Sequence, residues 1–317
     1  TQDDEYAALV EIYLAAITLD KKDDIKTYKA AVKAHPRFDD VSSYWWGAVA
    51  MEGSLSLLTN EALHDIDLAN LKAKILKKAD EIISYQNLGY PGVTWDPKSD
   101  QWDSGDQDDV DNNFRWGSHR MALNDARIVM AASEIEKADK KAERAAYYAR
   151  AAIRVLDHIS GVNAINLAMF TANGYPFIEN AVERTHDGVD RENTWPGKMV
   201  LGPNNWTNAN DPDMPKFGSK PGLKMFALTG TGWSSREISI DANASLVPVA
   251  YFAMEVAPAM LAKAPIAAAK TEAKTAEPAN TDNAVATEQH EEKKGGSLGF
   301  GALFVLLAGF IARRRIL

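Results

Sequence analysis

The feature that most constrains the fold of this chain is a helical hydrophobic period that recurs along most of its length. It is clearest near the N-terminus, where apolar residues return at spacings of three, four and seven: Tyr6, Leu9, Val10, Tyr13, Leu14 and Ile17. Similar patterns predict helices over 24–35, 41–58, 68–86, 118–138, 140–160 and 243–262. No strong alternation of apolar and polar residues, the mark of a half-buried strand, accompanies them. The sequence therefore predicts an all-α fold.

Two of the connections between these helices, 87–116 and 161–236, are unusually long. Paired helices whose long loops gather on one side are typical of an antiparallel helical array such as an (α/α)6 toroid. In such an array the helices form the scaffold and the loops carry the chemistry. We therefore expect the functional residues in and beside these two loops.

Composition excludes several classes of protein. The 317 residues are 46% hydrophobic and 25% charged, which is enough to bury a sizeable core. A net charge of -9 argues against nucleic acid as a partner, because phosphate recognition needs a basic surface. The chain has no cysteine, so it has no disulfide, thiolate nucleophile or cysteine-bound metal.

The C-terminal part of the chain changes character twice. Residues 1–262 read as the folded domain, and residues 263–294 consist mainly of Ala, Lys, Glu, Thr, Asn and Pro without any aromatic residue. Such a segment buries too little surface to order itself and is predicted to be a disordered linker. Residues 295–317 then form a tail with a Gly pair, an apolar run over 298–312 and a terminal Arg cluster.

This tail resembles the GlyGly carboxy-terminal sorting signal of Gram-negative bacteria. The resemblance implies export to the cell surface or medium, a transient membrane anchor at 298–312, and cleavage by a membrane-embedded protease of the rhomboid type. The alternative is a simple tail anchor, although fifteen apolar residues are fewer than the roughly 20 that a bilayer span needs. The N-terminal stretch TQDDEYAALV has no secretory signal features, so we expect either a processed chain or the C-terminal piece of a longer protein.

A family resemblance rests on motifs that follow one another in order. The segment FRWGSHRMALNDARIVMAASEI (114–135) is similar to the helix start FxWGSN…LN…A of glycoside hydrolase family 9, which contains cellulases and cellodextrinases. Four further segments resemble later motifs of that family: HISGVNAINLAMFTANGYPF (158–177), NAVERTHDG (180–188), WPGKMVLGPN (195–204) and REISIDANASLVPVAYF (236–252). The opening helix DEYAALVEIYLAAITLD also resembles the family. Several motifs in family order are a far more specific signal than one.

The resemblance implies inverting hydrolysis of β-1,4-linked glucans or related oligosaccharides, with Glu237 as the general acid. An inverting glycosidase needs one carboxylic acid to protonate the leaving oxygen and a second carboxylate to activate water. The alternative for Glu237 is a plain helix N-cap, because acidic residues are favoured at helix N-termini. Both roles can coexist in one residue.

The second carboxylate lacks its expected motif. In the family the base lies in a DAGD sequence upstream of every matched segment, and no such motif occurs here. The sequence WDSGD carries Asp103 and Asp106 at the right spacing, but it stands in the wrong place in the family order. We interpret its loop as a solvated acidic segment, with a structural calcium site as a lesser alternative. The matched part therefore resembles a family 9 toroid without its N-terminal hairpins.

Candidate substrate-binding residues follow from the same motifs. Arg184 keeps the Arg of the family's HHR loop, where its donors can hold sugar hydroxyls, and His186 lies two residues further on. Aromatic rings can pack on the apolar face of a sugar, which makes four loop residues candidates, although each could instead anchor a loop: Trp116, Tyr175, Trp206 and Trp233. Trp233 and Trp116 rank highest because they lie nearest to the matched motifs.

The chain departs from the family pattern at three matched positions. Val182 replaces a His, Arg236 replaces the Asn before the acid, and Ala242 replaces an aromatic residue. These changes imply either a different sugar or a decayed site. The six histidines lack the spacing of a helical zinc pair, and no cofactor is expected.

Three functions remain open from the sequence. The first is an exported β-glucan hydrolase, and the second is a non-catalytic carbohydrate-binding remnant of such a domain. The third, a purely structural helical surface protein, explains the tail but not the ordered motifs.

Overall fold

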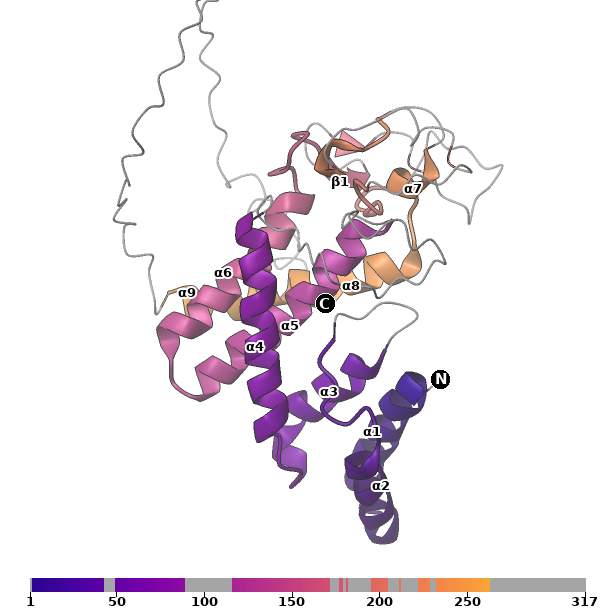
Figure 1. Cartoon of the computed structure of the whole chain (residues 1–317), viewed down its shortest axis with the longest axis vertical. Coiled ribbons are helices and arrows are strands. Elements are labelled where there is room, and N and C mark those ends of the chain that lie inside the picture. The colour runs from indigo at the N-terminus through magenta and orange to yellow at the C-terminus, as the bar shows by residue number, and fades with distance from the viewer. Residues whose placement is uncertain are drawn as a thin grey trace, which may run out of the picture. The chain divides into compact units, whose positions relative to one another are not determined.

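The structure is a computed structural model that describes residues 2–42, 49–88, 116–171, 177–178, 181, 195–204, 211, 222–228 and 232–262. These residues all belong to one unit, Thr1–Ala267, and they form mainly α-helices (Figure 1). The prediction of an all-α fold is confirmed. The predicted linker and tail, and the acidic loop with Asp103 and Asp106, lie outside the described residues.

Three helices form the N-terminal group. Helix α1 (Gln2–Thr18) packs against both α2 (Lys22–Ala34) and α3 (Ala50–Thr59). The predicted apolar stripe of α1 supplies this contact, because Tyr6 and Val10 are fully buried. Burying such side chains stabilises a fold by about 1.5–3 kcal/mol each.

Helix α3 is shorter than the sequence pattern predicts. The period suggested a helix over 41–58, whereas α3 begins at Ala50, after non-helical residues at 41, 42 and 49. Gly53 lies where α3 crosses α1, and a Cβ there would approach the Tyr6 ring to 3.1 Å. The absence of a side chain at Gly53 therefore allows the two helices to pack closely.

The rest of the helical array is organised around α5 (Ser118–Ala138). It packs against α4 (Ala69–Leu88), α6 (Ala142–Ile159) and α8 (Ile240–Tyr251). Its buried residues lie on every side of the helix, as expected for a helix in the middle of a core. Its N-terminus belongs to the first family-like motif (114–135) and lies at the candidate site described below.

Two helix pairs, α1 with α2 and α5 with α6, are joined by the same kind of three-residue turn. In each turn the middle residue has a positive φ, 51° at Asp20 and 62° at Lys140. The residue after it donates its N–H to a carbonyl five positions back, over 3.0 Å from Lys21 and 2.8 Å from Lys141. These bonds are those of a Schellman motif, which ends one helix and lets the next run back beside it.

The long connection after α6 contains short strands that the periodicity analysis did not predict. Strand β1 (Ala168–Thr171) pairs in parallel with β2 (Phe177–Ile178), and Phe170 forms an antiparallel bridge with Met199. Strands of two to four residues are too short to give a detectable alternation. The remaining elements are η1 (Glu61–Leu63), η6 (Gly222–Lys224), α7 (Trp233–Arg236), the π-helical η7 (Phe252–Val256) and α9 (Ala257–Leu261).

One helical run, Ile240–Leu261, is long and apolar enough to cross a membrane by length and composition. One of its faces belongs to the core, since Val249 and Phe252 are almost fully buried and α8 packs against α5 and α6. Core helices of soluble proteins satisfy the same criterion, so this run is weak evidence for a membrane span.

Candidate functional site

Glu237 lies in the short connection between α7 and α8. Its backbone is extended, with φ -63° and ψ 142°, and its N–H donates to the Trp233 carbonyl over 2.9 Å. The N-cap of α8 is Ser239, whose hydroxyl accepts the Ala242 N–H over 3.4 Å. Glu237 therefore stands two residues before the cap, and the interpretation of this acid as the N-cap of α8 is wrong.

The WPGKMVLGPN segment (195–204) holds the backbone around Glu237. The Leu201 N–H donates to the Glu237 carbonyl over 3.0 Å, and the Gly202 N–H donates to the Ser235 carbonyl over 3.0 Å. On its other side the same segment bonds to β1, where the Val200 N–H donates to the Met169 carbonyl over 3.1 Å. Backbone bonds of this kind fix both position and direction of a connection. Three of the family-like motifs therefore meet in one small layer.

Asn243 fastens helix α8 to this layer. Its amide oxygen accepts the Met199 N–H over 2.8 Å, and its amide nitrogen donates to the Met199 carbonyl over 2.9 Å. One side chain therefore bonds to both backbone polar groups of Met199. The Asn243 amide also donates to the Ser239 carbonyl over 2.9 Å. The relative position of α8 and the WPGKMVLGPN segment is fixed by these bonds.

Two buried polar side chains hold the other helix beside Glu237, α7. The Asn204 amide donates to the Ser234 carbonyl over 3.0 Å, and the Asp211 carboxylate accepts the Ser234 N–H over 2.7 Å. Both Asn204 and Asp211 are fully buried. A carboxylate that accepts from an N–H at a helix start is a charge-assisted bond, stronger than a neutral one.

His119, in the first turn of α5, packs against the WPGKMVLGPN segment. Its N–H donates to the Leu201 carbonyl over 3.1 Å, and its Nδ1 donates to the Val200 carbonyl over 2.9 Å. Gly202 has φ +93°, and a Cβ there would come within 2.6 Å of the imidazole ring. Complete burial lowers the pKa of His119 to about 4, although the bond to Val200 acts in the opposite direction. The ring is therefore neutral in the folded protein near pH 7.

The two tryptophans ranked as sugar platforms lie together beside Glu237. The rings of Trp116 and Trp233 meet edge to face, with centroids 6.0 Å apart and an interplanar angle of 82°. The Arg120 guanidinium lies over the Trp116 ring at 5.9 Å from its centroid. Contacts of this kind anchor the loops that carry the rings. A role in sugar binding stays a prediction.

Arg120 also links α5 to α8, the helix that follows Glu237. Its Nη1 donates to the Asp241 carboxylate over 2.7 Å, while its side chain is 4% exposed and that of Asp241 is 35% exposed. Burial opposes ionisation of Asp241, but hydrogen bonds from Ser239 and Arg120 outweigh it and lower its pKa. The pair is charged near neutral pH and fixes the N-terminus of α8 against that of α5.

Asn163 organises the turn in the motif that follows α6. Its amide donates to the His158 and Leu167 carbonyls over 2.8 and 2.7 Å, and its oxygen accepts the Ile165 and Leu167 N–H groups over 3.2 Å each. This arrangement leads the chain directly from α6 into β1. This second matched motif (158–177) thus has a structural asparagine, as do the WPGKMVLGPN segment and the motif that contains Glu237.

Of the seven predicted site residues, the structure describes three and brings them together: Trp116, Trp233 and Glu237. The other four lie outside the described residues: Tyr175, Arg184, His186 and Trp206. Residues that sequence reasoning did not single out support this site, and the asparagines among them could have been found by their places in the matched motifs: Arg120, Asn163, Asn204, Asp211, Asp241 and Asn243. Within the described ranges no group of three His, Cys, Asp or Glu residues is gathered as metal ligands.

Comparison with known proteins gives matches over much of the chain. The family model of glycosyl hydrolase family 9 matches residues 1–250. A cellodextrinase from Butyrivibrio fibrisolvens is 27% identical over 203 residues, which cover 64% of this chain and 33% of that protein. The matched part of this chain thus spans about a third of the length of that relative.

Solved structures show the same kind of fold. A metagenome-derived family 9 endoglucanase superposes with a TM-score of 0.53 and 23% identity, over 79% of this chain and 40% of that one. A family 9 protein from Bacteroides ovatus superposes with a TM-score of 0.57 and 22% identity, over 79% of this chain and 39% of that one. At this level of identity the similarity supports the predicted helical array, and it leaves more than half of each neighbour without a counterpart here.

Proposed function

Because this chain belongs to glycosyl hydrolase family 9, as its motifs predict, we propose that it carries the acid-bearing part of an inverting glycosidase site. The proposed substrates are β-1,4-linked glucans or related oligosaccharides, and the proposed general acid is Glu237. The observation that carries the proposal is the layer of matched motifs around Glu237, in which Leu201 bonds to its carbonyl and Trp233 accepts from its N–H. Catalytic groups need this kind of fixed support.

The chemistry assigned to Glu237 is proton donation. In an inverting reaction the acid protonates the oxygen of the departing sugar while water, activated by a second carboxylate, attacks the anomeric carbon from the opposite face. The two carboxyl groups of inverting enzymes stand about 6.5–9.5 Å apart, which leaves room for that water. Trp116 and Trp233, which lie together next to the acid, are the proposed platform for a sugar ring.

The base is proposed to come from polypeptide outside residues 1–262. No DAGD motif precedes the matched segments, and the match to the cellodextrinase covers 33% of that protein. An acid without an opposing carboxylate can protonate the leaving oxygen but cannot generate the attacking hydroxide equivalent. We therefore expect little or no turnover from residues 1–262 alone.

A second candidate function is a non-catalytic carbohydrate-binding remnant, favoured by the missing base motif and the departures from the family pattern. Two of those departures do not favour decay of the site, because Arg236 and Ala242 are almost completely buried. Ala242 is part of the hydrophobic core, and Arg236 is a buried charged residue directly before Glu237. Val182, Arg184 and His186 lie outside the described residues, where the substrate loop is expected.

The cellular setting is also part of the proposal. We propose an exported protein of a Gram-negative bacterium, held briefly in the membrane by 298–312 and released by a membrane-embedded protease. The support is the sequence of the tail: a Gly pair, a short apolar run and a basic end.

Two experiments test the catalytic proposal. Proton NMR of the first product formed from a β-linked cello-oligosaccharide by the natural gene product should show the α-anomer, and the β-anomer would contradict inversion. Residues 1–262, assayed on a chromogenic cellobioside, should show almost no turnover. Robust turnover that Asp103→Asn or Asp106→Asn abolishes would instead place the base in the acidic loop and overturn our assignment.

A further inference from the structure

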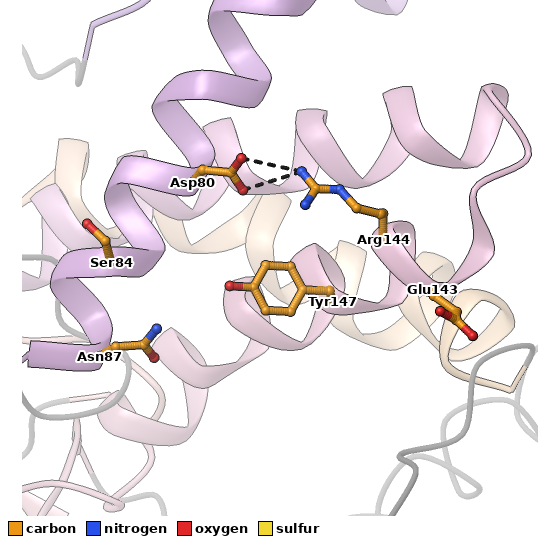
Figure 2. Close-up of a pocket in the computed structure, with 6 residues that line it drawn as sticks. All are labelled: Asp80, Ser84, Asn87, Glu143, Arg144 and Tyr147. Carbon is orange, nitrogen blue, oxygen red and sulfur yellow. Dashed lines mark hydrogen bonds and ion pairs between the residues drawn. The ribbon is translucent and has the colours of Figure 1, made fainter. Parts of the chain in front are cut away.

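A surface cavity of about 500 Å³ lies between α4 and α6, away from the candidate active site. It is lined by Asp80, Ser84 and Asn87 of α4 and by Glu143, Arg144 and Tyr147 of α6 (Figure 2). The three residues of α4 recur at spacings of four and three, and Glu143 and Tyr147 are four apart, so each helix presents one face to the cavity.

This cavity is separate from the candidate site around Glu237. The site residues stand at the N-terminus of α5, whereas α6 near the cavity contacts the other part of α5, where the Ser133 hydroxyl donates to the Ala145 carbonyl over 2.7 Å. Fifteen residues of helix separate Ser118 from Ser133, which is about 20 Å at 1.5 Å per residue. A ligand in the cavity would therefore occupy a second, separate position on the molecule.

One side of the cavity is a fixed ion-pair network. The Arg144 guanidinium bonds to Asp80 at 3.3 Å and to the buried Glu136 at 3.4 Å. The Tyr148 hydroxyl donates to Asp80 over 2.7 Å and also contacts Arg144. The positive charge of Arg144 is thus already paired, and the lining residues named above offer no unpaired cation for a phosphate or carboxylate ligand.

The other lining groups are open to a ligand. Tyr147 is 43% exposed, and its ring extends from α6 across the cavity towards Ser84 and Asn87 (Figure 2). The side chains of Asn87, Glu143 and Tyr147 have no hydrogen bond or ion pair among the residues that the structure describes. The ring meets that of Tyr148 edge to face with centroids 5.5 Å apart, which fixes its orientation.

We propose that this cavity is a secondary binding site for a neutral polysaccharide, a β-glucan chain, with Tyr147 as the platform for one sugar ring. An exposed ring face suits the apolar face of a pyranose, and the free amide of Asn87 and carboxylate of Glu143 suit its hydroxyl groups. An open cavity between helices also admits an internal segment of a long chain. The choice of glucan rests on the proposed function, since a polymer held at this cavity would be kept near the catalytic site at a high effective concentration.

The test uses the full chain, purified, with adsorption to amorphous cellulose and titration with cellohexaose. Tyr147→Ala and Asn87→Ala should each weaken binding at this site, the first by about 3- to 10-fold, the range expected for one aromatic contact. Tyr251→Ala is the matched control, because Tyr251 is 62% exposed on α8 and does not line the cavity, and its loss should leave binding unchanged when both proteins are compared as monomers at low concentration. Circular dichroism confirms that each variant is folded.

A fourth variant, Trp233→Ala, separates this proposal from the proposed function. Loss of affinity in Tyr147→Ala and Asn87→Ala but not in Tyr251→Ala supports the secondary site, whatever Trp233→Ala does. If only Trp233→Ala loses affinity, the secondary site is wrong and the assignment of the candidate active site stands. If the unaltered chain binds no cellulose or cellohexaose, the secondary site is wrong as stated. In that case the NMR experiment on the natural gene product decides the proposed function separately.

Discussion

At the scale of single residues, three asparagines in the matched motifs act as backbone clamps. Asn163 closes the turn after α6, and Asn204 bonds to the backbone of α7. Asn243 bonds to both the backbone N–H and the carbonyl of Met199. An asparagine can serve in this way because its side chain carries both an acceptor and two donors. The candidate site is therefore held by groups whose role is positional.

Replacement of Asn243 tests this role. Asn243→Ala leaves both backbone groups of Met199 without their partner, and such losses cost about 1–3 kcal/mol when the groups are buried. We expect the free energy of unfolding in urea to fall by that amount. Asn87→Ala is the control, since Asn87 is exposed on α4 and its loss should change stability by less than about 0.5 kcal/mol. Equal effects of the two substitutions would show that the clamp contributes nothing.

His119 gives a prediction about pH. Its pKa is about 4 in the folded protein and about 6.5 in an unfolded chain, so the unfolded state binds a proton between these values that the folded state excludes. Stability should therefore fall as the pH drops from 6.5 to 4, by up to about 3 kcal/mol from this residue. Urea unfolding at pH 7, 5.5 and 4.5 measures the slope. His119→Gln, which cannot titrate, should show a smaller slope, and an unchanged slope would contradict the assignment.

Residue-level prediction from the sequence had a clear limit. The structure places Trp116, Trp233 and Glu237 close to one another, while their roles in catalysis and sugar binding stay predictions. The capping of α8 by Ser239 and the ion pair between Arg120 and Asp241 depend on how separate segments pack. Contacts between residues 121 positions apart have no signature in local sequence.

At the scale of elements, the turn between α5 and α6 stores a small amount of strain. Lys140 has φ 62°, a conformation that costs a residue with a Cβ about 1 kcal/mol and costs glycine little. We expect Lys140→Gly to raise the free energy of unfolding by up to about 1 kcal/mol. Lys140→Val should lower it, because a β-branched residue is disfavoured at positive φ. Thermal unfolding monitored by circular dichroism checks both, and the same sign of change in the two variants would contradict the argument.

Helix positions followed from the sequence better than their ends. The helix predicted over 118–138 matches α5 at both ends, and its buried residues run from Ser118 to Glu136. The prediction over 41–58 began too early, since residues 41, 42 and 49 are not helical and α3 begins at Ala50. The strands β1 and β2 were missed because strands of four and two residues are too short to show an alternation of apolar and polar residues.

At the scale of the whole molecule, α8 and η7 have an exposed apolar stripe. Its four members recur at spacings of seven, four and three, and are 51–88% exposed: Ile240, Val247, Tyr251 and Met254. Contiguous exposed apolar surface of this kind promotes association. In each of the two solved neighbours described above, more than half of the chain has no counterpart in this protein's matched part.

We therefore expect this chain to self-associate when it is purified alone, and Val247→Glu to raise the monomer fraction. Sedimentation velocity at increasing protein concentration measures this fraction. Val162→Glu is the control, because Val162 is 59% exposed but lies outside the stripe. A monomeric unaltered chain, or equal gains from the two substitutions, would show that the stripe does not drive association.

Glu237 is proposed to be the proton donor of the site, and a leaving-group experiment tests that role directly. Glu237→Gln in the natural gene product should lower kcat/KM about 100- to 10,000-fold on cello-oligosaccharides, whose departing sugar needs a proton. On a dinitrophenyl cellobioside, whose leaving group departs without protonation, we predict a loss of less than about tenfold. Equal losses on the two substrates, or no loss on either, would contradict the assignment of Glu237 as the general acid.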